Sequence, residues 1–235
     1  MTLARVREDV DDGRVVQPAY TLRPMSEGDV EQVVALHQAC YPDALLTAMG
    51  SKVLRAVYRS YARSPRCVSL VAEVDGRVVA AVNGAIGEGF VRDIARRHPV
   101  VVLVGIARVL ATQPRLRELL LKRAVAVWRR TNTAAPAESP ARRFTWRSQA
   151  VAPAFRGSGL IFPLIKEMIH ELQARGVAEI FSTPEIDNQP SMWIHRVLGF
   201  RRIGERVSEN GKQQAVFVLP LQSVRDEAGA TVGQA

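Results

Sequence analysis

An arginine and two glycines stand at one junction of the sequence, between an apolar stretch ending at Val151 and a helical pattern beginning at Ile161. The junction contains Arg156, Gly157, Ser158 and Gly159. Successive backbone N–H groups in a turn that opens a helix form an anion site, and the helix dipole adds roughly half a positive charge there. Small residues let phosphate oxygens approach the main chain, and Arg156 adds a forked donor. The stretch by itself predicts either a phosphate site or a tight strand-to-helix turn.

Two blocks of the sequence together carry a resemblance to a known family. The first, "AVAPAFRGSGL" (150–160), resembles the acetyl-CoA motif of the GCN5-related N-acetyltransferases (GNAT superfamily), Arg/Gln-x-x-Gly-x-Gly/Ala preceded by Val-x-Pro. Arg156 and Gly159 match, and Ile161 stands where a final Gly or Ala is usual. The second, "NQPSMWIHRVLGF" (188–200), resembles the family's Asn-x-x-Ala-x-x-x-Tyr-x-x-x-Gly-Phe; the matches are Asn188, Gly199 and Phe200, with Ser191 in place of Ala.

The resemblance spans about residues 20–220, apart from an insert, and it implies a fold and an activity. The expected fold is α/β, a central mixed and largely antiparallel sheet flanked by helices. The expected activity is transfer of an acetyl group from acetyl-CoA to a small-molecule or peptide amine, by direct attack in a ternary complex and without a metal. Two alternatives stay open: a non-catalytic module that senses CoA or holds a partner, and acyl transfer to sugar or membrane-linked acceptors.

The same resemblance assigns binding residues. Backbone groups of Gln149, Ala150 and Val151 are expected to pair with the pantetheine amides and to face the thioester. The expected pyrophosphate loop comprises Arg156, Gly157, Ser158, Gly159, Leu160 and Ile161, and the second block adds Asn188 and Ser191. His37 and Tyr41 lie where the family shapes its acceptor pocket, although either residue is equally compatible with the core.

Proton transfer is assigned to His195 and Glu185. His195 occupies the position where many family members place a tyrosine that protonates the leaving thiolate. An imidazolium can do the same, since its reference pKa is about 6.5, against about 8.5 for a thiol. The alternative is that His195 packs on its helix and bonds locally. Many relatives have a Glu on the strand that corresponds to 143–151, but this strand carries no Asp or Glu. The nearest carboxylate in sequence to the expected cleft is Glu185. Glu185 is therefore expected to act either as the general base or only as a cap of its loop.

The elements that position these residues follow from periodicity and turn signals. Ser26 is expected to cap a helix that Pro42 ends, and Gly176 to cap the end of another. Strands are expected at 20–25, 143–151 and 177–183, helices at 46–62, 161–172 and 191–197, and hairpins at 67–87 and 201–221, turning at Asp75-Gly76 and Asn210-Gly211. Strands alternating with helices in the second half predict one parallel crossover within a mixed sheet.

An insert at 87–143 lies outside the minimal fold. It holds 12 Lys+Arg and 4 Asp+Glu, so its net charge of +8 accounts for nearly all of the chain's +9. A basic amphipathic helix is expected at 115–130 and a linker at 131–141. The insert could be a lid that attracts an anionic acceptor, a membrane-surface contact, or a homodimer-forming hairpin with a basic rim, which we favour. No aromatic stacking platform accompanies the arginines, which argues against nucleic acid.

Length and composition predict one folded domain in a reducing compartment. The chain has 235 residues and 47% hydrophobic residues, which suit a single domain at 19–222 with disordered ends at 1–18 and 223–235. Its two cysteines, Cys40 and Cys67, form neither a disulfide framework nor a metal spacing. The first twenty residues lack the apolar core of a signal peptide. We therefore expect a cytoplasmic protein.

Overall fold

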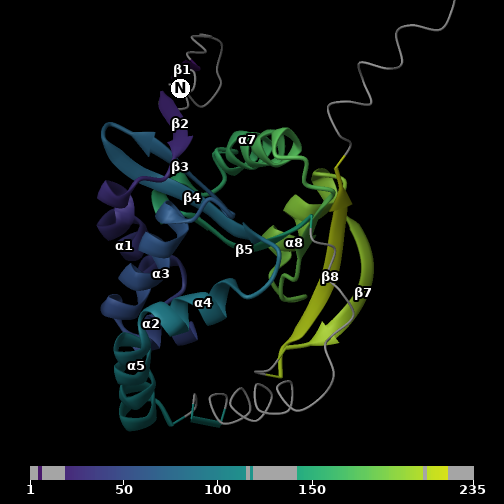
Figure 1. Cartoon of the computed structure of the whole chain (residues 1–235). Coiled ribbons are helices and arrows are strands. Elements are labelled where there is room, and N and C mark those ends of the chain that lie inside the picture. Colours follow the sequence, from purple (N-terminus) through teal and green to yellow (C-terminus); the bar gives the residue numbers. More distant parts are fainter. Residues whose placement is uncertain (1–4, 7–18, 115–116, 119–141, 209–210, 222–235) are drawn as a thin grey trace, which may run out of the picture.

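A mixed sheet of eight strands forms the centre of the computed structural model, which describes residues 5–6, 19–114, 117–118, 142–208 and 211–221 (Figure 1). In sheet order the strands are β1 (Arg5–Val6), β2 (Tyr20–Pro24), β3 (Cys67–Val74), β4 (Arg77–Ile86), β5 (Arg143–Val151), β6 (Glu179–Ser182), β8 (Gln213–Pro220) and β7 (Arg201–Val207). Neighbouring strands are antiparallel except β5 and β6, which are parallel. The predicted mixed, largely antiparallel sheet with one parallel crossover is confirmed.

Helices cover both faces of this sheet. They are α1 (Val30–Cys40), α2 (Leu45–Met49), α3 (Ser51–Arg63), α4 (Phe90–Arg97), α5 (Pro99–Thr112), α7 (Ile161–Ala174) and α8 (Gln189–Val197), with 3-10 turns η1 (Glu27–Asp29) and η2 (Pro153–Phe155). Side chains of β3 alternate between two apolar clusters, because Leu70 joins the cluster under α7 and α8 while Val71 joins the cluster under α1 and α3. The sheet is therefore buried from both sides.

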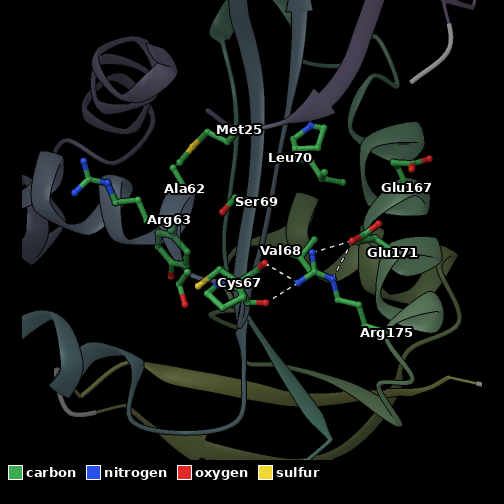
Figure 2. A pocket seen from close by; sticks show the side chains of 14 residues that line it. Met25, Ala62, Arg63, Cys67, Val68, Ser69, Leu70, Glu167, Glu171 and Arg175 are labelled. Carbon is green, nitrogen blue, oxygen red and sulfur yellow. Dashed lines mark hydrogen bonds and ion pairs between the residues drawn. The ribbon is translucent and has the colours of Figure 1, made fainter. Parts of the chain in front are cut away.

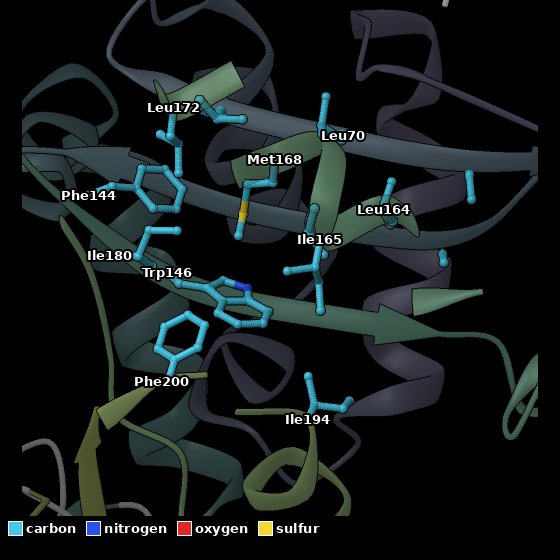
Figure 3. Packing of buried hydrophobic residues seen from close by; sticks show 14 of the residues in the cluster. Leu70, Phe144, Trp146, Leu164, Ile165, Met168, Leu172, Ile180, Ile194 and Phe200 are labelled. Carbon is cyan, nitrogen blue, oxygen red and sulfur yellow. The ribbon is translucent and has the colours of Figure 1, made fainter. Parts of the chain in front are cut away.

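The helix α7 supplies the centre of one core. Its residues Leu164, Ile165, Met168 and Leu172 are each fully buried against the sheet, as their helical spacing predicts (Figure 3). Complete burial of one such side chain contributes about 1.5–3 kcal/mol. This face fixes α7, and with it the loop that leads into its first turn.

The hairpin between β3 and β4 is confirmed at its turn. Asp75 has φ +49° and Gly76 has φ +75°, the two left-handed residues that a tight two-residue hairpin requires. The predicted helix over 46–62 is wrong at one position. Gly50 has φ +100°, which a helix does not allow, so α2 ends at Met49 and α3 begins at Ser51.

Several predictions fall on residues that the structure does not describe. The basic helix at 115–130 lies outside the described residues except at 117–118, as do the linker at 131–141, the tail at 223–235 and most of 1–18. Within 1–18, Arg5–Val6 forms β1 and pairs with β2. In the described part of the chain, no helix has both the length and the apolar character needed to cross a membrane.

A partly buried ion pair links the first elements to the sheet. Arg23 of β2 donates to both carboxylate oxygens of Asp29, at 2.6 and 2.7 Å, and also bonds Glu73 of β3. Asp29 in turn accepts the Ser26 backbone N–H at 2.7 Å, which completes the expected cap of the first helix. The Arg23 guanidinium lowers the pKa of Asp29 to about 2.

We expect Asp29→Asn to lower the free energy of unfolding at pH 7 by about 2 kcal/mol, measured by urea denaturation. The depressed pKa means that this contribution is complete above about pH 4 and is lost as pH falls through about 2. The difference in the free energy of unfolding between Asp29→Asn and wild type should therefore narrow as the pH falls below about 4. Glu31→Gln, which breaks the exposed Glu31–Arg55 pair, is the control and should cost less. A pH-independent difference would contradict the assignment.

Candidate active site

The sheet opens between β5 and β6. These strands pair over only three positions, Arg143–Thr145 with Glu179–Phe181, and β6 ends at Ser182 while β5 continues to Val151. Beyond Thr145, the edge of β5 on this side has no strand partner among the described residues. We call this stretch, from Trp146 to Val151, the splay. It exposes backbone groups at the centre of a sheet, where a ligand with amide groups can pair with them.

A β-bulge sets which backbone groups face the splay. Gly84 of β4 lies opposite Trp146, but Asn83 lies opposite Ser148, so β5 carries one extra residue, Arg147. The Ala152 N–H donates to the Val79 carbonyl at 2.8 Å. Because backbone groups alternate sides along a strand, Ala150 turns its own toward β4, and Gln149 and Val151 turn theirs toward the splay.

This register shows which of the three residues predicted to contact pantetheine turn their backbone groups toward the splay; the contacts themselves stay a prediction. Gln149 and Val151 present backbone groups to the splay, as the expected role requires. Ala150 does not, because its N–H and C=O point into the β4–β5 ladder, so its inclusion needs correction. The bulge was not visible in the sequence, which carries no glycine or proline at 147 to mark it.

Gly84 allows this close pairing. A Cβ atom there would lie 2.1 Å from Phe144 Cζ and 2.5 Å from the Thr145 carbonyl oxygen. No side chain fits, and the Phe144 ring fills the space instead, fully buried.

Three side chains contact the carbonyls of the splay. The Tyr41 hydroxyl donates a short hydrogen bond to the Gln149 carbonyl. The Cys40 thiol donates to the Val151 carbonyl at 3.3 Å, and Arg156 Nε donates to the same oxygen at 3.4 Å. Arg156 Nη2 also lies 3.7 Å from Cys40 Sγ. The end of α1, the splay and the predicted phosphate loop therefore meet at one place.

The two glycines of the predicted phosphate loop are left-handed, a conformation that suits both an anion site and a tight strand-to-helix turn. Gly157 and Gly159 both have φ +80°, and α7 begins two residues later at Ile161. A Cβ atom at Gly157 would meet nothing within 4 Å, so packing does not demand this glycine and the space beside it is open. Ser158 and Leu160 shape the turn, since Ser158 Oγ accepts the Leu160 N–H at 3.3 Å. Ile161 packs against the core under α7, which keeps its side chain out of the loop.

The second sequence block anchors α8. Asn188 Oδ1 accepts the Ser191 N–H at 3.2 Å, which caps the helix. The Ser191 carbonyl accepts a hydrogen bond from the His195 ring one turn later. In the described structure, Asn188 and Ser191 thus hold the helix together, and no contact places them in the phosphate loop.

His195 lies inside the core. Its ring, 2% exposed, stacks between Trp146 and Phe217, with ring centres 5.1 and 4.9 Å away. Nδ1 is 2.7 Å from the Ser191 carbonyl and must donate, so in the neutral ring Nε2 accepts from the Ser182 hydroxyl at 2.9 Å. Burial lowers the pKa of His195. A neutral ring with both nitrogens bonded has no proton to offer, so this geometry favours the packing alternative over the general acid.

Glu185 is also engaged. Lys212 Nζ donates to its carboxylate at 2.6 Å, and the backbones of Glu185 and Gln214 form an isolated β-bridge. This arrangement ties the loop after β6 to the last hairpin. It fits the loop-capping alternative better than a free base.

A buried polar chain leads to His37. Ser69 donates to Asn83, Asn83 donates to Ser148 at 3.3 Å, and Ser148 bonds Tyr58, whose hydroxyl lies 2.8 Å from His37 Nδ1. If the Tyr58 hydroxyl donates to the His37 ring, then Nδ1 of the neutral ring accepts, and the hydrogen of that ring is on Nε2. Burial lowers the pKa of His37 to about 4, so the ring is neutral at physiological pH.

Two polar atoms at this place are buried without a hydrogen-bond partner among the described residues. They are His37 Nε2 and Gln149 Oε1. The His37 ring lies 5.0 Å from the Tyr41 ring, centre to centre, and Tyr41 bonds the Gln149 backbone. Such orphaned atoms are rare in folded proteins and mark a water or ligand position. The sequence indicated His37 and Tyr41 but missed Cys40, Tyr58, Asn83 and Ser148.

A pocket of about 290 Å³ lies elsewhere, beside the first residues of β3 (Figure 2). It is lined by Glu167 and Glu171 of α7 and by Arg175, which follows that helix, whereas the phosphate loop precedes the first turn of α7. Arg175 donates to the Pro65 and Cys67 carbonyls and pairs with Glu171. These bonds cover the strand edge, and none of the predicted site residues lines this pocket.

Comparison with known proteins places the fold. No protein-family model and no curated protein sequence matches the chain. Among solved structures, the ribosomal-protein-S18-alanine N-acetyltransferase from Escherichia coli matches with a TM-score of 0.54 at 14% identity, over 92% of this chain and 99% of that one. The ribosomal-protein-alanine N-acetyltransferase from Brucella melitensis gives 0.55 at 18% identity, over 85% and 99%.

A third match, yncA from Salmonella typhimurium, was solved with its cofactor acetyl-CoA; its TM-score is 0.55 at 15% identity, over 86% of this chain and 94% of that one. The chain therefore has the fold of these acetyltransferases, which is the GNAT fold that the sequence resemblance implied. At these identities the likeness establishes the architecture, and the chemistry must be argued from the residues.

We expect His195→Ala to lower the free energy of unfolding by about 3 kcal/mol, because it empties an aromatic stack and leaves Ser182 unpaired. Urea denaturation measures this loss. His170→Ala, at an exposed position of α7, is the matched control and should change little. Unchanged stability in His195→Ala, with an altered pH profile of turnover, would instead restore the general-acid role.

Proposed function

We propose that the protein is an acetyltransferase that moves an acetyl group from acetyl-CoA to an amine. The observation that carries the proposal is the meeting of two features at one place. A loop with two left-handed glycines and Arg156 opens α7, and it directly follows a strand whose backbone faces an opening in the sheet. A phosphate cradle beside a strand edge that has no strand partner among the described residues matches the two ends of a CoA molecule, its pyrophosphate and its pantetheine arm.

The residues of the chain have distinct roles in this proposal. The backbone N–H groups of the loop and the Arg156 guanidinium hold the pyrophosphate. The backbone of Gln149 and Val151 pairs with the pantetheine amides, after Tyr41, Cys40 and Arg156 release the carbonyls they contact. The amine nitrogen then bonds to the thioester carbonyl carbon, the C–S bond breaks, and the proton lost by the amine ends on the CoA sulfur. Positioning supplies most of the rate enhancement.

Tyr41 is the proton donor that fits this geometry best. Its hydroxyl lies at the splay, against Gln149, and burial raises the pKa of Tyr41 to about 12. The phenol therefore stays protonated throughout the neutral range. As the C–S bond breaks, the hydroxyl gives its hydrogen to the sulfur and takes up the proton that the amine loses, so that Tyr41 ends protonated. Neither His195 nor Glu185 has a free group to offer there.

His37 supports an acceptor that carries an oxygen near its amine. Its Nε2 is buried without a partner among the described residues, and the His37 ring centre lies 5.0 Å from that of Tyr41. In the tautomer whose Nδ1 accepts from the Tyr58 hydroxyl, this nitrogen is a donor. A peptide or amino acid presents a carbonyl or carboxylate oxygen close to its amine and would satisfy this donor. Two of the structural neighbours are named for alanine of ribosomal proteins, so peptides beginning with alanine belong in the acceptor screen.

A second candidate function is a non-catalytic CoA-binding module. The engagement of both His195 and Glu185 in structural bonds favours it, because the residues first assigned to proton transfer are occupied. Release of free thiol in the presence of an amine panel separates the two functions. Acetyl-CoA binding without any turnover supports the module.

The binding site is tested by titration calorimetry with acetyl-CoA. We expect wild-type protein to bind and Arg156→Glu to weaken binding at least about tenfold, because a charge-assisted bond to phosphate is replaced by repulsion. Arg77→Glu makes the same charge change at an exposed position of the β3–β4 hairpin and should bind as wild type. Absence of wild-type binding, or unchanged binding by Arg156→Glu, would refute the proposal.

For Tyr41→Phe we expect kcat to fall about a hundredfold, with KM for acetyl-CoA changed less than about threefold. The ring and its contact with His37 remain, and only the hydroxyl is lost. Thiol release against amine concentration measures both constants. Tyr61→Phe removes a buried hydroxyl from the same core, next to Phe90, and is the matched control. Equal kcat in wild type and Tyr41→Phe would remove Tyr41 from proton transfer.

A further inference from the structure

The helix α5 is apolar on two opposite sides. Its inner side packs on α2 and α3: Val109 is fully buried, and a Cβ atom at Gly105 would lie 2.7 Å from Val53. Its outer side is exposed, with Val100, Leu103 and Val104 at 69%, 63% and 59%. A helix that is apolar all round normally has cover on every side.

The exposed residues form one continuous stripe. They recur at helical spacing over the 14 residues of α5, a length of about 21 Å. The members of this outer stripe are Val100, Leu103, Val104, Ala107, Leu110 and Ala111. Figure 1 shows α5 at the outer edge of the molecule, beyond α2 and away from α8 and β7. Soluble monomers rarely expose an uninterrupted apolar surface, so the stripe indicates an interaction site.

Exposed arginines lie near the stripe in the sequence. Arg92, Arg96 and Arg97 are exposed on α4, which leads directly into α5, and Arg108 is exposed on α5 itself. Of the four acidic residues in 87–143, Asp93 already bonds Arg66. The segment as a whole carries a net charge of +8.

We propose that the outer stripe of α5 and the arginines of α4 form a docking surface for an anionic lipid bilayer. An apolar helix face beside arginines is the pattern of a helix that lies in the membrane interface, where the stripe enters the acyl boundary and the arginines meet lipid phosphates. At about 21 Å, α5 is shorter than the roughly 30 Å hydrocarbon core, so it lies on the bilayer rather than across it.

Charge favours lipid over a second copy of the chain. A symmetric dimer through the stripe would bring the exposed arginines of α4 and α5 from two copies toward one another, and their repulsion would oppose the apolar contact. An anionic bilayer covers the same apolar surface and compensates the charge. The occupant that the sequence favoured for the insert, a dimer, is therefore the weaker choice for α5.

The test is co-sedimentation of the full-length protein with vesicles. We expect binding to vesicles of phosphatidylglycerol and phosphatidylcholine in equal parts, and none to phosphatidylcholine alone. Leu103→Glu with Val104→Glu should lower the bound fraction about tenfold. Ile203→Glu with Val207→Glu, at 58% and 68% exposure on β7, gives the matched control and should bind as wild type.

The charge component is tested separately. Arg96→Gln with Arg97→Gln should weaken vesicle binding and flatten its dependence on salt, whereas Arg77→Gln with Arg201→Gln should leave both unchanged. Circular dichroism establishes that each variant is folded. The proposal is overturned if the wild-type protein does not sediment with anionic vesicles. It is also overturned by a dimer, seen by analytical ultracentrifugation, that Leu103→Glu with Val104→Glu dissociates without affecting vesicle binding.

Discussion

The close approach of β4 and β5 at Gly84 is the constraint on which the centre of the molecule depends. Because residue 84 has no side chain, the Phe144 ring lies directly against the β4 backbone, and the two strands keep their pairing up to the bulge at Arg147. The bulge then decides which amides face the splay. A larger residue at 84 would disturb the core under α7 and the register of Gln149 and Val151 together, so packing and site geometry are not separable here.

The two faces of the sheet differ in whether their buried polar groups are all hydrogen-bonded. On the α7 and α8 face, the stack of Trp146, His195 and Phe217 is closed and fully bonded, and it keeps the end of β6 in place. On the α1 and α3 face, polar groups run through the core and end at His37, whose outer nitrogen has no partner in the described part of the chain. A satisfied network stabilises a fold, whereas an incomplete one at an opening is available to a ligand.

Structural features that depend on residues close together in the sequence were predicted correctly. The Asp75-Gly76 turn, the bounds of β5 and the buried face of α7 all follow from turn chemistry and periodicity, and each was correct. The break at Gly50 was missed because the apolar pattern continues across it. The packing of His195 could not be predicted, since its partners Ser182, Trp146 and Phe217 come from three different strands. The contact of Tyr41 with Gln149 joins residues 108 positions apart, and no spacing rule reaches that far.

The carbonyls of Gln149 and Val151 already accept hydrogen bonds from Tyr41, Cys40 and Arg156. Any ligand arm that takes these positions therefore exchanges one set of bonds for another, and the net gain from the exchange is small. Affinity must come from the end of the ligand that meets the glycine loop, where the space is open. Under the proposed function, the chain would thus discriminate by the presence of the phosphate-bearing half of a thioester. Short thioesters without that half would be poor competitors, however well their amides fit.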